Sequence, residues 1–487
     1  MTALVTAVST LGLLTFSDTE PPFIERLRAE THVVGGLTAA EAAARADATS
    51  GDVAARSAEI DAAKATAEQA WVAYLPRLAG SARYTRLSAI EPPLLGVSVA
   101  APTAPVGPLP AGTPLFNVPI RFPTPLDQIS FQATLAVPLS DYLLRIAPTH
   151  AAALSAEAAA RFAYQATRQH AVLGTKVLYY EWARARLSRV VVEAALAQVR
   201  GHLADARKAL TAGSASRADA LRVEAQEADA EQAVVRARTL TAALESRLRT
   251  VMHIDDHAPL AIGEAIERDV TIAVESRDLD HLTADAEQAR PEVRGLDASI
   301  DALARQARAA AGAATPALAV LGEVTDANPN PRYLPSPDRF SATWSLTAQL
   351  TWSPNDAASS VQAYRALRAR QSAALSQRRA LKDDLRAEIA RALAAVDDAV
   401  SGQVTAARAV VSAEESQRVR RALFQNGRAT SVELTDAETE LTRARLAVIG
   451  AHVDARLAEL QLIHALGRDL LGSPVHESTS RAEGPRD

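Results

Sequence analysis

The residues best placed to do chemistry are acidic side chains that follow two matching glycine-containing segments, 212–219 and 426–433. In each segment a hydroxyl residue follows the glycine by three positions, and an acid follows the hydroxyl by another three. This spacing predicts a turn in which glycine ends one helix and the hydroxyl caps the next. Glu433 would complete a capping box, for which Asp219 is a shorter substitute. The residues concerned are Gly213, Ser216 and Asp219 in the first segment and Gly427, Thr430 and Glu433 in the second.

A further acid, Asp436, lies three residues after Glu433. On a helix this spacing places both carboxylates on one face, where they could attract cations. A plainer interpretation also accounts for the pair, because Glu433 could simply complete the cap while Asp436 is solvated. The two interpretations differ in whether this face of the helix attracts cations or only contacts solvent.

Other reactive side chains form no pattern typical of catalysis. His253 and His257 have the i, i+4 spacing of a zinc-binding helix, but Pro259 and the loop-forming residues around them argue against one. The chain has no cysteine, no glycine-rich phosphate loop and no local Ser/His/Asp motif. We therefore predict that the protein is not an enzyme and holds neither a metal ion nor a cofactor.

The composition indicates long helices rather than a wide globular core. The chain has 487 residues, of which only 4% are aromatic, and alanine is abundant. Small residues suit helices that pack closely along their length. The 52 basic and 57 acidic residues are interspersed and leave a net charge of −5, which predicts no nucleic-acid partner.

The first 17 residues are mostly apolar and resemble the hydrophobic part of a signal peptide. No lysine or arginine precedes Arg26, so either the gene start is truncated or the match is accidental. No later run of about 18 apolar residues occurs, so no transmembrane helix is predicted. If the protein crosses a membrane, it must do so with strands.

The chain repeats the order helix, strand, strand, long helix, turn, return helix. We predict the first copy over 18–251, with helix 38–74, strands 77–87 and 129–139, long helix 143–211 and return helix 216–251. The second copy, over 285–466, would have helix 285–313, strands 317–325 and 341–353, long helix 357–426 and return helix 430–466. A connection over 252–284 would join the copies, and 467–487 would form a tail.

The second predicted strand of each copy alternates apolar with polar residues, and the first strand does so more weakly. One apolar and one polar face are typical of a barrel that meets lipid outside and water inside. The predicted lipid-facing residues are Ile129, Phe131, Leu135, Trp344, Leu346, Leu350 and Trp352. Residues 89–128 hold so many prolines that we predict an extended loop with no regular element.

The long helices are predicted to be rods of on the order of 90–105 Å. The return helix 430–466 carries two heptad stripes, and two stripes imply two neighbouring helices, as in a ring of helices. One stripe contains Leu434, Leu441, Val448, Ala455 and Leu462, and the other contains Leu446, Val453 and Leu460.

With these elements in order, the chain over about 38–470 resembles the TolC family of outer-membrane efflux proteins. The pattern Phe424-x-x-Gly427-x-x-Thr430-x-x-Glu433 is similar to the family's periplasmic hairpin. The pattern Leu210-x-x-Gly213-x-x-Ser216-x-x-Asp219 is similar to its first copy. The stretches 73–78 and 137–141 are similar to its helix-to-strand and strand-to-helix junctions.

The resemblance implies a mixed α+β membrane protein of the bacterial outer membrane that extends into the periplasm. In that family a homotrimer forms a twelve-stranded β-barrel, four strands per chain, continued by a long antiparallel α-helical barrel. The connection 252–284 and the tail would lie outside this tunnel, at its equator. The hairpin tips would meet a periplasmic adaptor protein tied to an inner-membrane pump. The tip residues are Gly213, Ser216, Phe424, Gly427 and Thr430.

The resemblance also implies an acidic constriction at Glu433 and Asp436, with Asp219 at the matching place of the first copy. The family has a basic residue where this chain has Ala429, so another arginine would have to supply the ion pairs of a closed state. The candidates are Arg428, Arg217 and Arg222.

Two functions follow from the sequence. The first is a passive exit duct of a tripartite efflux or type I secretion system. The second is a soluble, alanine-rich coiled-coil scaffold. The paired strands and the proline-rich loop favour the duct, because a scaffold needs neither.

Overall fold

The structure is a computed structural model that describes residues 23–89, 95–100, 107–108, 111, 115–120, 125–213, 215–255, 259–269, 276–334 and 337–471. The predicted signal peptide over 1–17 lies outside the described residues, as do His257 and most of the tail 467–487.

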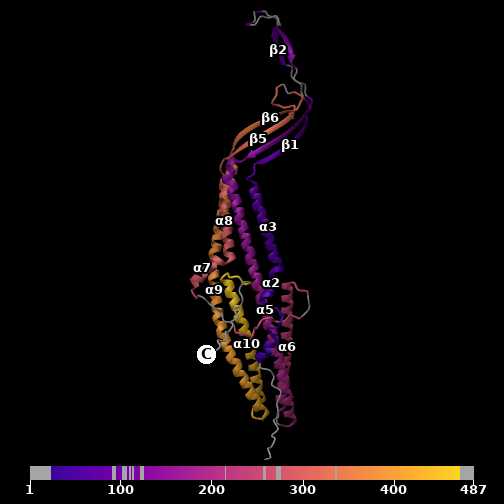
Figure 1. Cartoon of the computed structure of the whole chain (residues 1–487), viewed down its shortest axis with the longest axis vertical. Helices are drawn as coiled ribbons and strands as arrows, with labels where there is room; N and C mark the ends of the chain where they lie inside the picture. Colours follow the sequence, from indigo (N-terminus) through magenta and orange to yellow (C-terminus); the bar gives the residue numbers. More distant parts are fainter. Residues whose placement is uncertain are drawn as a thin grey trace, which may run out of the picture. The chain divides into compact units, whose positions relative to one another are not determined.

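The described chain is mainly helical, with a four-stranded and a two-stranded sheet (Figure 1). The first half contains α1 (Phe23–Glu30), α2 (Ala39–Thr49), α3 (Gly51–Val72), β1 (Arg77–Arg86), β2 (Leu95–Ala100), β3 (Leu115–Ile120), β4 (Asp127–Val137), α4 (Leu139–Asp141), the π-helix η1 (Tyr142–Ile146), α5 (Ala147–Thr211) and α6 (Arg217–Met252). The second half contains α7 (Leu279–Ala289), α8 (Pro291–Gly312), β5 (Ala317–Asn328), β6 (Ser341–Thr351), α9 (Pro354–Gln425) and α10 (Ser431–Ala465).

The chain divides into two compact units. Unit 2 comprises Asp61–Ala159 and Leu296–Ser376 and holds the strands. Unit 1 comprises Met1–Ile60, Ala160–Gly295 and Gln377–Asp487, and it holds both helix-to-helix turns. No helix in the described part of the chain has a run that is long and apolar enough to span a bilayer.

The four-stranded sheet has the order β1-β4-β5-β6 and is antiparallel throughout, with β1 and β6 at its edges. Residues directly opposite each other on neighbouring strands share a face. One such row is apolar and contains Leu78, Leu135, Gly322 and Leu346. A row of the other face is polar and contains Ser81, Gln132, Thr325 and Thr343.

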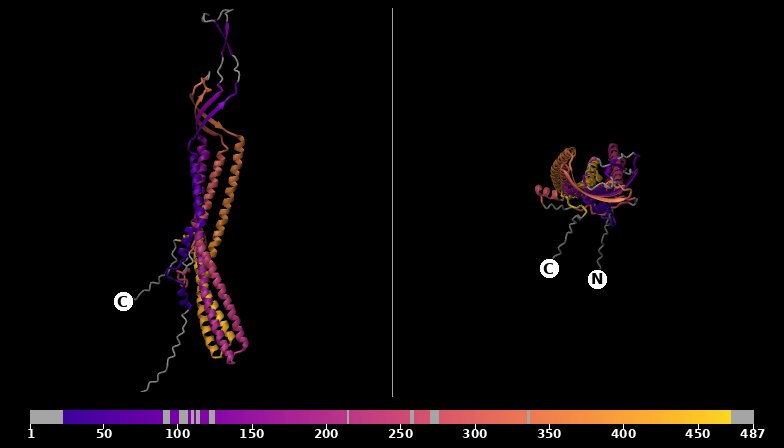
Figure 2. Two further views of the ribbon diagram at one scale, coloured as in Figure 1. Left: turned by 90° about the vertical axis from the view of Figure 1, so that its right-hand side faces the viewer. Right: turned by 90° about the horizontal axis from the view of Figure 1, so that it is seen from above.

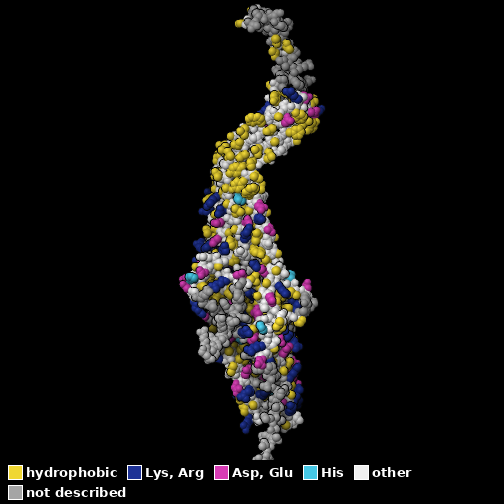
Figure 3. Space-filling view, viewed as in Figure 1, with side chains coloured by type: hydrophobic (Ala, Val, Ile, Leu, Met, Phe, Trp, Pro, Cys, Tyr) yellow, Lys and Arg dark blue, Asp and Glu magenta, His cyan; other side chains and the backbone are white. Residues whose placement is uncertain are grey.

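The apolar face of this sheet is exposed in the single chain. Trp344 is 73% exposed and Leu346 is 71% exposed, and the other predicted lipid-facing residues are exposed as well. Figure 3 shows the hydrophobic side chains gathered over this sheet. Large apolar side chains on one face of an isolated sheet mark a surface that something else covers.

The prediction that 89–128 has no regular element is wrong. β2 and β3 pair as a two-stranded antiparallel sheet, with Val97 opposite Val118. Most of the prolines lie between or outside these strands, so they do not interrupt the pairing. Pro119 lies inside β3, where a two-stranded sheet leaves one side of the strand free of ladder hydrogen bonds.

The predictions of single helices over 38–74 and 285–313 are also wrong, because each segment contains two helices. The backbone leaves helical geometry at Ser50 (ψ 122°) and again, 240 positions later, at Arg290 (ψ 123°). Pro291 accounts for the second break, since a proline disfavours helical geometry in the residue before it. At the first break Ser50 is the C-cap of α2, and Gly51 begins α3.

Smaller corrections concern where elements begin and end. The segment predicted as one long helix from 143 opens with the π-helical turn η1 before α5 begins at Ala147. The other predicted long helix begins at Pro354 rather than 357, and β5 continues to Asn328 rather than 325.

The core of unit 1 centres on aromatic residues of α5. Tyr179, Tyr180 and Trp182 are fully buried and pack on one another. The Tyr179 hydroxyl donates to Leu37 O (2.7 Å), and the Tyr180 hydroxyl donates to Glu264 (2.9 Å). The largest fully buried side chains in the described part of the chain therefore lie on α5.

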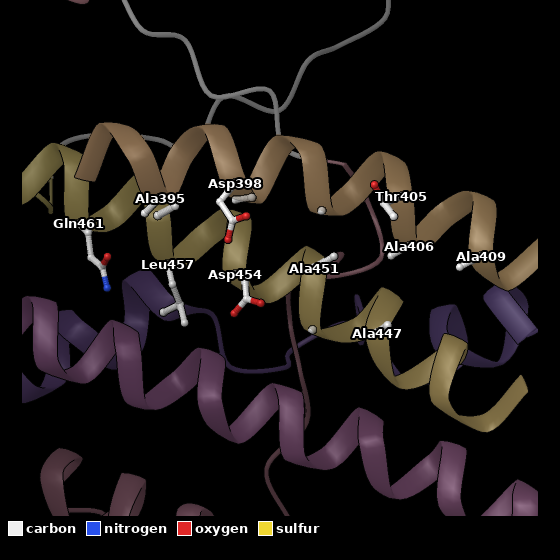
Figure 4. Close-up of a pocket in the computed structure, with 14 residues that line it drawn as sticks. Ala395, Asp398, Thr405, Ala406, Ala409, Ala447, Ala451, Asp454, Leu457 and Gln461 are labelled. Atoms are coloured by element: carbon white, nitrogen blue, oxygen red, sulfur yellow. The ribbon is translucent and has the colours of Figure 1, made fainter. Parts of the chain in front are cut away.

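The α10 stripe that begins at Leu434 is shared between two apolar clusters of unit 1, whereas Val453 and Leu460 of the other stripe belong to the cluster around Tyr179. Leu441 and Val448 join the cluster around Tyr179, whereas Ala455 and Leu462 pack with Leu385 and other residues of α9. A groove of about 630 Å³, lined mostly by alanine and glycine, also lies between α9 and α10. Figure 4 shows its lining residues on both helices. Small side chains therefore leave the two helices incompletely packed in a single chain.

Gly312, the last residue of α8, is predicted to be essential for packing in unit 2. A Cβ at this position would collide with the backbone carbonyl of Leu144 in η1. Replacing Gly312 with alanine should lower the free energy of unfolding by about 1–3 kcal/mol, as overpacking typically does. Thermal denaturation of the purified protein, followed by circular dichroism, would measure this.

Gly174 in α5 provides the matched control, because a Cβ there would meet open space. Gly174→Ala should raise stability by about 0.5–1 kcal/mol, since alanine loses less backbone entropy in a helix. Equal effects of the two substitutions would contradict the proposed collision.

Candidate functional site at the hairpin tips

Unit 1 ends in two helix-to-helix turns, α5–α6 and α9–α10, which lie at the same end in every side view (Figures 1 and 2). Gly213 (φ 73°) and Gly427 (φ 69°) adopt the left-handed conformation that ends each incoming helix. In the second turn Gly427 N–H donates to Phe424 O (2.9 Å) and Arg428 N–H donates to Leu423 O (2.8 Å). Glycine is required here by the positive φ, not by a lack of space.

Each outgoing helix begins with a complete capping box. Ser216 and Thr430 are extended, with ψ values of 157° and 158°. Thr430 N–H donates to Glu433 Oε2 (2.9 Å), and Ser216 N–H donates to Asp219 Oδ2 (3.2 Å). Asp219 is therefore not a weaker substitute, because its carboxylate also accepts from the Ser216 hydroxyl (2.6 Å).

These hydrogen bonds keep both capping acids ionised at neutral pH. The hydroxyl and then the N–H of Ser216 lower the pKa of Asp219 below its ordinary value. The N–H of Thr430, and next the charge of Arg420, lower the pKa of Glu433. Asp436 is exposed one turn further along α10.

Glu433 forms an ion pair with Arg420, an arginine that was not among the candidates predicted from the sequence. Arg420 Nη1 lies 2.9 Å from Glu433 Oε1, and both side chains are 44% exposed. Arg420 precedes Gly427 by seven residues and Glu433 follows it by six, so antiparallel pairing across the turn brings them together. Of the arginines proposed from the sequence, Arg222 is close enough to lower the pKa of Asp219 slightly.

A buried polar cluster joins the two hairpins just behind their tips. His202 of α5 lies with Nε2 3.2 Å from Ser431 Oγ and with Nδ1 3.4 Å from Glu438, both on α10. The ring of Phe424, at the end of α9, packs edge-on against His202 with centroids 5.0 Å apart. His202 therefore holds the first hairpin against both helices of the second.

The cluster has the serine–histidine–acid order of a nucleophilic site, but its geometry suits packing. Ser431, His202 and Glu438 are all buried, so a substrate cannot reach the Ser431 hydroxyl in this arrangement. The sequence analysis missed these residues because 229 positions separate His202 from Ser431. The sequence offered only a weak indication of this cluster, namely polar residues at helix positions where the periodicity predicts apolar ones.

The predicted constriction acids lie on two different helices. Glu433 and Asp436 are exposed on the first turns of α10, and Asp219 occupies the corresponding place on α6. Among the described residues, no hydrogen bond or ion pair connects Asp219 with Glu433 or Asp436.

The sequence matches the model of the outer membrane efflux protein family over residues 42–252 and 282–468. The chain belongs to this family. It is therefore an efflux channel protein of the bacterial outer membrane that reaches into the periplasm, and the scaffold function is not favoured. No curated protein sequence matches the chain.

Solved outer-membrane channels share the fold of this family member. The outer membrane protein VceC of Vibrio cholerae is 18% identical, with a TM-score of 0.67 over 88% of this chain and 95% of that one. The MtrE channel of Neisseria gonorrhoeae, solved in its open state, is 15% identical, with a TM-score of 0.71 over 88% and 89%. The CmeC channel of Campylobacter jejuni is 13% identical, with a TM-score of 0.69 over 96% and 94%.

The His202 cluster of this efflux protein yields a prediction about the hairpins. His202→Phe would remove the imidazole whose Nδ1 lies 3.4 Å from the buried Glu438 carboxylate, which has no hydrogen-bond partner among the described residues, and we expect a loss of about 1–3 kcal/mol of stability. Additional replacement of Glu438 with leucine should recover most of the loss, because an apolar pair needs no partner. Denaturant unfolding of the three proteins would measure this; a double variant no more stable than the single one would contradict it.

Proposed function

We propose that three copies of this chain form a continuous exit duct whose sheets close a twelve-stranded barrel in the outer membrane. The observation that carries the proposal is the sheet β1-β4-β5-β6, with one apolar face, one polar face and two free edges. Its apolar face, which carries the predicted lipid-facing residues such as Ile129 and Trp352, would meet lipid. Its polar face would line the water-filled lumen.

The free edges determine how copies must associate. Unpaired N–H and C=O groups are not tolerated in lipid, so β1 and β6 each need a partner strand. Because neighbouring strands in the sheet are antiparallel, β6 of one copy can pair with β1 of the next and continue the alternation. Eight strands would hold little more than packed side chains, whereas twelve leave an open lumen. Trimeric assembly in this family supports the same number of strands, since three chains with four strands each give twelve.

The hairpin tips would form the periplasmic end of the duct. The support is the pair of matched, capped turns at one end of unit 1, held in register by His202. We infer that Gly213, Ser216, Gly427 and Thr430 meet a periplasmic adaptor protein that connects the duct to an inner-membrane pump. Phe424 would contribute indirectly, since its half-buried ring packs on His202.

The exposed carboxylates of Glu433 and Asp436 on α10 would form a constriction of the duct at the hairpin tips. In a threefold assembly, Glu433 and Asp436 of each copy would surround one opening, with Asp219 nearby on α6. A ring of carboxylates favours cations and repels anions. Arg420 would neutralise part of this charge through its ion pair with Glu433.

Strand pairing between copies can be tested by disulfide crosslinking, because the chain has no cysteine of its own. Ser81→Cys on β1, combined in turn with Thr343→Cys, Ser345→Cys and Thr347→Cys on β6, should give a covalent trimer for at least one pair after oxidation. Denaturing gel electrophoresis would reveal it. Gln132→Cys on the inner strand β4 replaces Ser81→Cys in the control and should give no trimer. Absence of crosslinked trimers in every β1–β6 pair would contradict the barrel.

The carboxylate ring can be tested in planar bilayers. Asp436→Asn and Glu433→Gln should each lower cation selectivity, and glutamine should still serve in the capping box. Arg420→Gln should raise cation selectivity, because it leaves the Glu433 charge uncompensated. Glu440→Gln removes an exposed carboxylate paired with Arg443 on the same helix and is the control. Unchanged selectivity in the first three variants would leave only the capping role.

A further inference from the structure

Three potential metal ligands meet where three helices of unit 1 come together. His170 belongs to α5, Glu292 is the second residue of α8, and His464 is the residue before the end of α10. One ligand atom of each lies within 4.8 Å of the other two. His170 Nε2 is 3.2 Å from Glu292 Oε1, and the two imidazole rings are 5.2 Å apart. We propose that these side chains bind a divalent transition-metal ion.

His464 is the observation that distinguishes this cluster from an ordinary ion pair. It is only 6% exposed, and its ring packs edge-on against that of His170, with centroids 5.2 Å apart. A second imidazole beside an imidazole–carboxylate pair completes a set of three ligands, which an ion pair alone lacks.

Arg290 holds the carboxylate ligand in place from the opposite side. Its Nε donates to Glu292 Oε2 (3.0 Å), while Nη2 is 3.3 Å from Oε1, the oxygen that faces His170. Burial opposes ionisation of Glu292, but the hydrogen bond with His170 and the Arg290 charge lower its pKa to about 2. A hydrogen-bonded, ionised carboxylate is the usual form of this ligand.

Arg290 also connects the half-buried Glu292 with the backbone of His464. Its Nη1 donates to the backbone oxygen of His464 (3.0 Å) and to Glu388 Oε1 (3.1 Å). The Glu388 carboxylate offsets the guanidinium charge, which would otherwise repel a cation. The site therefore has two ligands held by one buried arginine and a third, His170, whose side chain is 56% exposed.

The ligand set determines the class of metal. Two imidazoles and one carboxylate suit Zn²⁺, Co²⁺, Ni²⁺ or Cu²⁺, whereas Mg²⁺ and Ca²⁺ prefer oxygen ligands alone. Tetrahedral coordination with bonds of about 2.0–2.2 Å places ligand atoms roughly 3.4 Å apart, so side chains whose ligand atoms now lie within 4.8 Å of one another would have to move closer around a bound ion. Water would complete the coordination on the side of the exposed His170. A bound ion would tie the first repeat, through His170, to the second, through Glu292 and His464.

The test uses the full-length protein, purified in detergent without a histidine tag and stripped with a chelator. Titration with Co²⁺, followed by visible d–d absorption, should show one saturable site per chain, and Zn²⁺ should displace the Co²⁺. His464→Gln should weaken binding at least tenfold. His170→Gln should do the same, and because this side chain is exposed, its loss should not affect folding. Zn²⁺ should raise the melting temperature of the unmodified protein but not of either variant.

His281→Gln is the matched control, because His281 also faces a carboxylate, with Nδ1 3.1 Å from Asp285, but on an exposed surface. It should bind Co²⁺ as tightly as the unmodified protein. The proposal would be overturned by absence of a saturable site, by unchanged affinity in His170→Gln and His464→Gln, or by equal loss in His281→Gln. None of these outcomes depends on assembly of the duct.

Discussion

A backbone that enters lipid must have all its N–H and C=O groups paired, and most of this architecture follows from that constraint. The four-stranded antiparallel sheet of this chain ends in two free edges. The most exposed apolar side chains of this sheet, such as Trp344 and Leu350, lie on one face, while serine, threonine and glutamine are common on the other. In the proposed trimer, neighbouring copies pair with these edges and close the sheet.

The hairpin tips obey a different constraint, since here water satisfies the backbone and the problem is precise placement of a turn. Local chemistry solves most of it: a left-handed glycine ends each incoming helix, and a capping box begins the next. Side-by-side placement of the two turns depends on long-range contacts, above all those of the buried His202. The tips thus combine an exposed acidic surface with a buried polar anchor directly behind it.

The duplication is visible in structural detail as well as in sequence. Ser50 and Arg290 break the first helix of each copy at the same place and with nearly the same backbone angles. The two breaks have since acquired different surroundings. Ser50 is a simple cap, whereas Arg290 is buried and organises Glu292, Glu388 and the end of α10. The proposed metal site therefore belongs to one copy of the repeat and borrows a single ligand from the other.

The sequence by itself determined the features that depend on neighbouring residues. The alternation of apolar and polar residues predicted that Phe131 and Leu346 lie on the exposed apolar face. The Gly-x-x-Ser/Thr-x-x-Asp/Glu spacing located both turns. Both predictions were possible because strand faces and helix caps depend on residues only a few positions apart. Only the tertiary structure decided which distant groups meet. The Arg420–Glu433 pair, the His202 cluster and the meeting of His170 with His464 each join separate helices, and no local spacing encodes such contacts. Proline density also misled the analysis at 89–128, since strand pairing depends on where prolines fall rather than on their number.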